Sequence, residues 1–430
     1  MNPQAEELNN IILEKNPAIF ELLSERGKNI YFPKRGILAQ SADANGTKIN
    51  ATIGAAIEDD KSPMRLDVIA SKIDLAPGLS FPYAPSFGRP DLRSKWKSMI
   101  YEKNPSLSGA EISLPIVTNA LTHGVNMAGY LFVNDGEEVI SPDLFWDNYD
   151  LILTNSFGAK IGTFNTFKNG GFDLEAFKNK LNEGPIGKKI VILNFPNNPS
   201  GYSPSVDENN AIAEILTAAA ELGNKIVVFC DDAYFGLVFE EGVERESIFA
   251  KLSKAHENIL ALKLDGPTKE DYVWGFRVGF MTYGVKGGDA ELYSALESKT
   301  AGAVRGNISN ASNLSQSLLL QAYNHADYQS QKEEKFNTLK ERYEAVKEAL
   351  KNEDYKKYFN ALPYNSGYFM CVKPVEGIDG EELRHLLNKK YSIGVINLNN
   401  LIRIAFAAVP AKDVKTLFDG IYEACKEIKG

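Results

Sequence analysis

Cysteine and histidine are scarce in this chain of 430 residues, which has three cysteines and four histidines. Cys230, Cys371 and Cys425 lie far apart and form no CxxC pair. This spacing argues against a disulfide framework or a zinc site and makes the cytoplasm the expected location. The histidines form no HExxH or similar cluster, which argues against histidine-based metal chemistry.

Long apolar runs and an excess of positive charge are also missing. No apolar run approaches the roughly 20 residues that cross a bilayer, and the opening residues, MNPQAEELNN, are polar and acidic, unlike a secretory signal. The formal net charge is −9, so the overall charge favours neither nucleic acid nor an anionic membrane as a partner. We therefore expect the partners to be small molecules.

An apolar content of 44% is enough for a large core and for more than one domain. Between about residues 95 and 285, short apolar runs alternate with helical patterns, among them 122–133 and 205–222. Such alternation predicts an α/β fold with a mostly parallel sheet covered by helices on both faces. The expected strands are 114–118, 137–140, 150–154, 189–193, 225–229, 259–264 and 277–282.

The two ends of the chain have a different pattern. Residues 6–25 have the spacing of one amphipathic helix. The C-terminal part reads as α+β, with helices expected at 315–352 and 411–428 and strands at 367–373 and 401–407. We predict a large domain over 63–325 and a smaller domain built from 1–62 and 326–430.

Unusual polar segments follow three of the predicted strands: Asn194–Gly201 (NFPNNPSG), Asp231–Tyr234 (DDAY) and Gly266–Lys269 (GPTK). Each has an ordinary interpretation, as a tight turn, a helix cap or a solvated lysine. In doubly wound sheets, however, ligands bind beyond the carboxyl ends of the strands. The three segments therefore also predict a binding cleft at that edge.

Two lysines compete as a reactive amine in this cleft. Lys263 lies inside a predicted strand, whereas Lys269 follows the strand and precedes Arg277 by eight residues. Near an arginine and a cationic ligand, an amine loses its proton more easily and becomes nucleophilic. The spacing therefore favours Lys269.

In this order, the segments resemble the fold-type I pyridoxal-phosphate-dependent aminotransferases, the aspartate aminotransferase superfamily of class I and II, from about residue 50 to 410. The resemblance implies a seven-stranded, mostly parallel sheet flanked by helices, pyridoxal 5'-phosphate as cofactor and a homodimer with shared active sites. It also implies transfer of an amino group from an L-amino acid, aspartate- or glutamate-like or aromatic, to a 2-oxo acid.

The resemblance assigns roles around the cofactor ring. Lys269 is similar to the lysine that holds the cofactor as a Schiff base and then moves the substrate proton. Asp231 resembles the acid that pairs with the ring nitrogen, and Asn198 and Tyr234 resemble the pair that hydrogen-bonds the ring's 3-oxygen. Trp146 falls where the family stacks an aromatic side chain on the ring, although a core tryptophan is the alternative.

Further roles concern the phosphate and the substrate. Arg403 resembles the arginine that binds the substrate α-carboxylate, assisted by Gly54 and Asn198, because a guanidinium matches a carboxylate in bidentate geometry. Arg305 resembles the arginine with which dicarboxylate-specific members reach across the dimer, but a solvated loop arginine is the alternative. The resemblance implies that the cofactor phosphate is bound by Arg277, Thr268, Leu121, Thr122 and the partner subunit's Tyr83.

The sequence also departs from the family pattern. Gly266 stands where Ser or Thr is usual, so one phosphate hydroxyl is missing, and the acidic pair Glu270-Asp271 beside the lysine is unusual. A lyase or decarboxylase on the same scaffold remains an alternative, since it would use the same cofactor residues. A non-catalytic relative is a second alternative, against which the joint presence of Lys269, Asp231 and Arg403 argues.

Overall fold

A seven-stranded sheet forms the centre of the protein in the computed structural model, which describes residues 1–31 and 36–430. β10 runs antiparallel to both of its neighbours and the other strands are parallel, so the predicted α/β fold with a mostly parallel sheet is confirmed. In spatial order the strands are β2 (Ile116–Thr118), β10 (Gly279–Gly284), β9 (Ile259–Asp265), β8 (Lys225–Asp231), β7 (Lys188–Asn194), β3 (Glu138–Pro142) and β4 (Lys160–Phe164).

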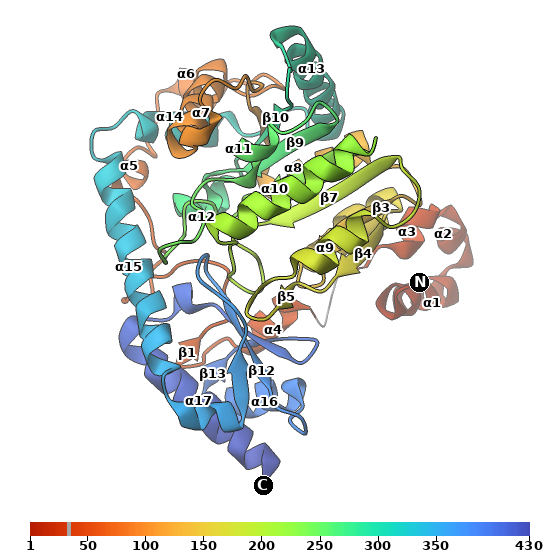
Figure 1. Cartoon of the computed structure of the whole chain (residues 1–430). Helices are drawn as coiled ribbons and strands as arrows, with labels where there is room; N and C mark the ends of the chain where they lie inside the picture. Colours follow the sequence, from red (N-terminus) through yellow and green to blue (C-terminus); the bar gives the residue numbers. More distant parts are fainter. Residues whose placement is uncertain (32–35) are drawn as a thin grey trace.

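Alternate residues of the central strands enter separate cores on the two faces of this sheet. In β7, Ile190 and Ile192 belong to one core, while Val191 and Leu193 belong to the other. Side chains that alternate across a strand explain why these strands are apolar throughout, since both faces are covered. Figure 1 shows α9 and α10 lying across one face of the sheet.

Helices cover both faces of the large sheet. α8 buries Val125 and Met127 against one face, and α10 buries Ile212 and Leu216 in the core of the other. The helices of this part are α5 (Asp67–Ala70), α6 (Pro77–Ser80), α7 (Pro90–Lys103), α8 (Ala120–Phe132), α9 (Leu174–Leu181), α10 (Val206–Glu221), α11 (Ile248–Leu252), α12 (Pro267–Glu270), α13 (Ala290–Asn307) and α14 (Asn313–Tyr323).

The strand predicted at 150–154 is wrong. Residues Asp150–Asn155 form a π-helical turn, η2, and the edge strand is β4 instead. Ile152 and Leu153 are buried in the same core as α8, but they reach it from a helical turn and not from a strand. A short apolar run has no periodicity that separates a strand from a helix.

The C-terminal part has its own antiparallel sheet of β11 (Phe359–Ala361), β12 (Met370–Pro374), β15 (Leu401–Ile404) and β14 (Ile396–Leu398). Nearby, β1 (Ile49–Asn50) pairs in parallel with β13 (Ile393–Gly394). α15 runs from the large sheet to this part (Figure 1) and packs there against α17. The helices here are α4 (Ile37–Asp43), α15 (Tyr328–Ala349), α16 (Gly380–Leu386) and α17 (Ala411–Lys429).

Two of the three long helices predicted toward the ends of the chain are interrupted, whereas the third, at 411–428, is the continuous helix α17. The pattern at 315–352 is two helices, α14 and α15, because the chain bends so that Tyr323 and Tyr328 both donate to Asp271, at 2.9 and 2.8 Å. The pattern at 6–25 is three helices, α1 (Pro3–Lys15), α2 (Pro17–Leu22) and α3 (Glu25–Asn29). Pro17 starts the second helix, since proline is tolerated at a helix N-terminus but not inside a helix.

The three N-terminal helices lie beside the large sheet (Figure 1). Asn2 and Tyr31 line one cavity together with Asp150 and Gly158, which precede β4. Residues 1–31 therefore contact the large part of the molecule, whereas the sequence assigned all of 1–62 to the smaller domain. Among the described residues, no helix is long and apolar enough to cross a membrane.

The turn after β7 connects the large sheet to the C-terminal part through Gly201. Its carbonyl oxygen accepts hydrogen bonds from the N–H groups of Asn365 and Ser366, both at 2.9 Å. Its φ is +73°, and a Cβ atom here would lie 1.8 Å from the carbonyl oxygen of Phe369. Only glycine fits, because both the backbone angle and the space exclude a side chain.

We predict that Gly201→Ala destabilises the protein more than Gly46→Ala does. Gly46 has φ +81° with nothing within 4 Å of its missing Cβ, so alanine there should cost only the left-handed penalty of about 1–2 kcal/mol. At Gly201 the overpacking against Phe369 adds about 1–3 kcal/mol. Urea unfolding of both variants measures the difference, and equal destabilisation would contradict the predicted close approach.

Candidate active site

A cavity of about 430 Å³ opens at the carboxyl edge of the large sheet, facing the C-terminal part. It brings together residues that lie up to 366 positions apart, from Ile37 to Arg403. Eleven of the thirteen predicted site residues line it: Gly54, Leu121, Thr122, Trp146, Asn198, Asp231, Tyr234, Thr268, Lys269, Arg277 and Arg403.

The parallel register of three strands explains how the polar segments meet. Asn194, the last residue of β7, is the register partner of Asp231 at the end of β8, and Asp231 is the partner of Leu264 in β9. Parallel strands have their carboxyl ends at the same edge of the sheet. Lys269 follows β9 in the short helix α12 and so enters the cavity beside Asp231.

Lys269 has the properties of a reactive amine. Burial lowers the pKa of Lys269 to about 8; the charge of Asp231 opposes this shift and that of Arg277 adds to it. The Nζ atom lies 4.9 Å from the centre of the Tyr234 ring. A lowered pKa leaves a useful fraction of the amine unprotonated near neutral pH, as a nucleophile or a base requires.

Lys263, the competing lysine, is held as a cation. It is buried in β9, forms a short hydrogen bond to Asp232, and lies 3.3 Å from a carboxylate oxygen of Asp265. Burial alone would lower the pKa of Lys263, but these two carboxylates raise it above its ordinary value. A fully paired ammonium is no nucleophile, and Lys263 does not line the cavity.

Asp231 is held by residues that the sequence did not point out. It is 3% exposed and accepts hydrogen bonds from the Tyr149 hydroxyl at 2.5 Å and from the Ala233 N–H at 3.1 Å. Burial raises the pKa of Asp231, while the Tyr149 hydrogen bond and the charge of Lys269 lower it. A buried carboxylate of this kind favours a protonated group opposite it.

Asn194 fixes the turn that carries Asn198. Its amide nitrogen donates to the carbonyl oxygen of Asp231 at 2.9 Å, and its side-chain oxygen accepts from the Asn198 N–H at 2.8 Å. The same side chain therefore joins the ends of two strands and orients the next asparagine. Because Asn194 also lines the cavity, it is a site residue that the sequence analysis missed.

Arg403 lies on the opposite wall, on β15 of the C-terminal sheet. It is 2% exposed and donates to the Asn198 side-chain oxygen at 3.1 Å and to the Thr52 carbonyl oxygen at 3.3 Å. Its guanidinium carbon lies 4.3 Å from the centre of the Phe369 ring. Within the described part of the chain, its Nε is buried without a hydrogen-bond partner, which leaves donor capacity for an anion.

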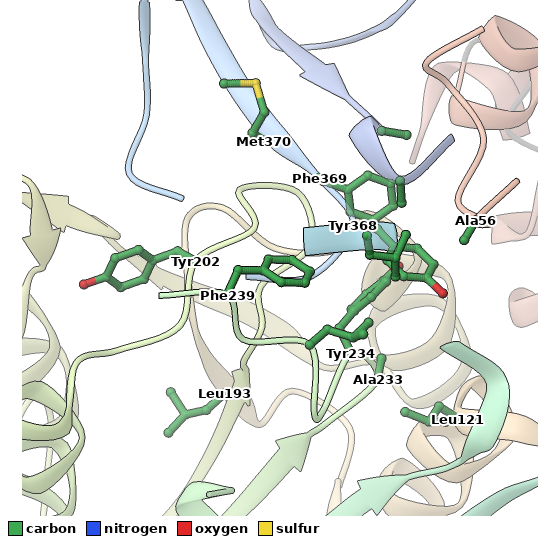
Figure 2. Packing of buried hydrophobic residues seen from close by; sticks show 14 of the residues in the cluster. Ala56, Leu121, Leu193, Tyr202, Ala233, Tyr234, Phe239, Tyr368, Phe369 and Met370 are labelled. Carbon is green, nitrogen blue, oxygen red and sulfur yellow. The ribbon is translucent and has the colours of Figure 1, made fainter. Parts of the chain in front are cut away.

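Aromatic side chains form the wall between Lys269 and Arg403. Figure 2 shows Tyr234, Tyr368 and Phe369 gathered where the large sheet meets the C-terminal part. The Tyr234 ring lies 5.4 Å from that of Tyr368 and 5.5 Å from that of Phe369. The Tyr368 hydroxyl donates to the Lys269 carbonyl oxygen at 2.8 Å, so this wall also fixes the backbone of the lysine.

Hydrogen-bond donors also lie at the start of α8 and in the turns on either side of Lys269. Leu121 and Thr122 belong to the first turn of α8, whose free N–H groups suit an anion. The Thr268 hydroxyl is buried and has no partner among the described residues, and the Arg277 guanidinium lines the same cavity. This end of the cavity can therefore bind a phosphate.

Tyr83 and Arg305 do not line this cavity. Tyr83 is 91% exposed, and Arg305 at the end of α13 is exposed and donates to the Ser309 hydroxyl at 2.8 Å. Their two segments are neighbours, because the Ser86 hydroxyl donates to the Ser309 carbonyl oxygen at 2.8 Å. Neither residue contributes to the site of its own chain.

The unusual acidic pair after Lys269 forms a buried charge network behind the site. Lys332 of α15 lies 3.1 Å from a Glu270 oxygen and 3.2 Å from an Asp271 oxygen, and Lys103 of α7 is bound to Glu270 at 2.5 Å. Because buried charges must be paired, the pair fixes α12 to two helices. Glu and Asp side chains are usually exposed to solvent, whereas these two are buried in the network.

The sequence analysis missed five residues that shape the site: Tyr149, Asn194, Trp274, Tyr368 and Phe369. Two of them had a usable signal, since Asn194 follows a predicted strand as Asp231 does, and Tyr149 follows Trp146 by three positions. Tyr368 and Phe369 had none, because only the packing of the C-terminal sheet against the turn at Gly201 brings them to the cavity.

Comparison with known proteins agrees with this geometry. Residues 48–421 match the family model described as aminotransferase class I and II. The chain is 27% identical over 201 residues to a probable N-acetyl-LL-diaminopimelate aminotransferase of Bacillus subtilis, covering 46% of this chain and 47% of the relative. It is 27% identical over 315 residues to an aspartate aminotransferase of a Bacillus species, covering 71% and 72%. Some matches to the curated relatives thus span only about half of their length.

Solved structures share the fold. A crystal structure of an aminotransferase from Anaerococcus prevotii superposes with a TM-score of 0.81 at 23% identity, covering 94% of this chain and 98% of that one. An aromatic aminotransferase from Pyrococcus horikoshii superposes with a TM-score of 0.73 at 17% identity, covering 92% and 100%. With the family model matching most of its length, the chain belongs to the class I and II aminotransferase family.

Proposed function

We propose that this protein is an aminotransferase that moves an amino group from an L-amino acid to a 2-oxo acid, with pyridoxal phosphate held on Lys269. The observation that carries the proposal is one cavity with a buried amine of lowered pKa between an acid and an arginine. The family is generally dependent on pyridoxal phosphate, and 27%-identical relatives carry aminotransferase names.

The residues present fit the cofactor. The phosphate suits Arg277, the first turn of α8 and the buried Thr268 hydroxyl, which has no partner in the part of the chain that the structure describes; Asp231 suits the ring nitrogen. Asn198, Tyr234 and Trp146 line the same cavity; the first two would hold the ring oxygen, and Trp146 would cover the ring. When bound, pyridoxal phosphate supplies an aldehyde for the amine and a ring that accepts electrons from the substrate.

The chain itself supplies three actions. Lys269 provides the amine and, once released, a base for the proton on the substrate Cα, because its lowered pKa leaves it partly unprotonated. Asp231, held by the Tyr149 hydroxyl, would present its carboxylate to the ring nitrogen. Arg403 orients the substrate by its α-carboxylate, and Gly54 lies on the same side of the cavity.

We further propose a homodimer in which Tyr83 and Arg305 reach the partner's cavity. Their exposure and the contact between their two segments support this arrangement. We also propose a large domain over 63–325 and a smaller domain from 1–62 and 326–430. Residues 1–31 of the smaller domain contact the large domain. A cytoplasmic location fits the three free, buried cysteines.

We expect the reaction of Lys269 with pyridoxal phosphate in the cofactor-free protein to rise with pH about a midpoint near 8. The lowered pKa of about 8 means that the amine becomes neutral well below the range of an ordinary lysine. Borohydride reduction followed by peptide mass mapping measures the labelled fraction at each pH. A label on Lys263, or a midpoint near that of an ordinary lysine, would overturn the assignment.

Lys269→Ala should reduce transamination by about 10⁴-fold or more while still allowing some cofactor binding, since the variant loses both the amine and the base. Amino transfer to 2-oxoglutarate is the measurement, and Lys160→Ala, which changes an exposed lysine on β4, is the matched control. Release of ammonia and pyruvate by the unchanged protein, without amino transfer, would instead favour a lyase.

Arg305→Ala should weaken aspartate and glutamate as donors selectively, by a few kcal/mol at most for a lost charge pair. Aromatic donors carry no second carboxylate and should be little affected. Comparing kcat/KM for the two classes of donor checks the expectation. An equal loss for all donors would show that Arg305 does not bind the substrate side chain.

A further inference from the structure

Position 266 cannot supply the hydroxyl that the family usually places there. A Cβ atom on Gly266 would lie 2.9 Å from both the Gly279 Cα and the Val278 carbonyl oxygen, and 3.2 Å from the Leu121 Cδ1. The first two are backbone atoms of the chain segment entering β10, so they cannot move aside as a flexible side chain can. A serine or threonine at 266 would therefore clash, and the missing donor must come from another residue.

Trp274 has a buried donor with no acceptor. It begins the short 3-10 turn Trp274–Phe276, and it lines the cavity together with Thr268 and Arg277. Its side chain is partly exposed, yet the indole Nε1 is buried and has no hydrogen-bond partner in the described part of the chain. Burying an N–H group unpaired is unfavourable, so an acceptor from a ligand is expected.

The backbone of Trp274 is tied to Arg277 of the phosphate end, and its ring extends toward Tyr368 of the aromatic wall. The Arg277 guanidinium donates to the Trp274 carbonyl oxygen at 3.2 Å, so the two residues belong to one turn. The Trp274 ring also lies 6.1 Å from that of Tyr272 and 6.5 Å from that of Tyr368. The carboxylate-binding Arg403 belongs instead to β15, across the cavity.

We propose that the Trp274 indole N–H donates a hydrogen bond to the phosphate of the bound cofactor and so replaces the hydroxyl that Gly266 excludes. This inference rests on the proposed function. Indole nitrogen is a donor only, which suits the oxygens of a phosphate. With the Thr268 hydroxyl and the Arg277 guanidinium, it gives this end of the cavity three side-chain donors besides the amides of α8.

The test is Trp274→Phe in the full-length chain, which keeps an aromatic ring and removes the N–H. Dissociation constants of the cofactor-free protein are measured for pyridoxal phosphate, for pyridoxal, which lacks the phosphate, and for inorganic phosphate. We expect a loss of roughly ten-fold or more for the two phosphate compounds, as for a hydrogen bond to a charged group, and none for pyridoxal. Trp146→Phe is the matched control and should affect both pyridoxal forms alike.

Equal weakening of pyridoxal phosphate and pyridoxal by Trp274→Phe, or no change in either, would overturn the proposal. So would an unchanged cofactor affinity with a raised KM for the amino acid, since Trp274 would then contact the substrate. If the unchanged protein binds no pyridoxal phosphate, the proposed function fails; if it binds and Trp274→Phe binds equally well, only the role of Trp274 fails.

A second measurement avoids dependence on the folding of the variant. The chain has only three tryptophans, so its indole N–H proton signals can be assigned from Trp96→Phe and Trp146→Phe. Adding inorganic phosphate to the unchanged protein should move the Trp274 signal downfield and leave the Trp96 signal in place, because the Trp96 N–H already donates to Asp265 at 3.1 Å. An unmoved Trp274 signal at saturating phosphate would contradict the proposal.

Discussion

The parallel register of β7, β8 and β9 is the constraint on which the site depends. Because Asn194 and Asp231 are register partners and β9 ends at the same edge, three segments that are distant in sequence present polar groups to one cavity. A shift by one residue in any of these strands would turn every side chain to the opposite face. The two separate cores, with Ile190 on one face and Val191 on the other, oppose such a shift.

Neighbouring charges give the two lysines in and after β9 different pKa values. Lys263 lies inside β9 between two carboxylates and stays protonated, whereas Lys269 lies beyond the strand beside one acid and one arginine. The acidic pair after Lys269 is neutralised from behind by Lys103 and Lys332. Both carboxylates of this pair are thus bound to cations of other helices, and burial lowers the pKa of Lys269.

Much of the fold was predictable because its strands carry strong local signals. Six of the seven expected strand runs contain or overlap strands of the large sheet, and the helix expected at 205–222 is α10. The strand predicted at 150–154 is wrong because three consecutive apolar residues fit a helical turn as well as a strand. The helix at 315–352 is divided because Tyr323 and Tyr328 bind the same carboxylate of Asp271, a long-range contact that no local pattern contains.

By itself, the sequence determined which residue types follow the strands, and the family resemblance carried by their order and spacing pointed to eleven residues that line one cavity. Tertiary structure alone decided which groups are left without partners. Within residues 1–31 and 36–430, the Nε of Arg403, the hydroxyl of Thr268 and the indole N–H of Trp274 have no partner, which depends on the atoms that distant segments bring near them. Burial and hydrogen bonding belong to the packed chain as a whole, so a residue's ability to hold a ligand appears only when its neighbours are in place.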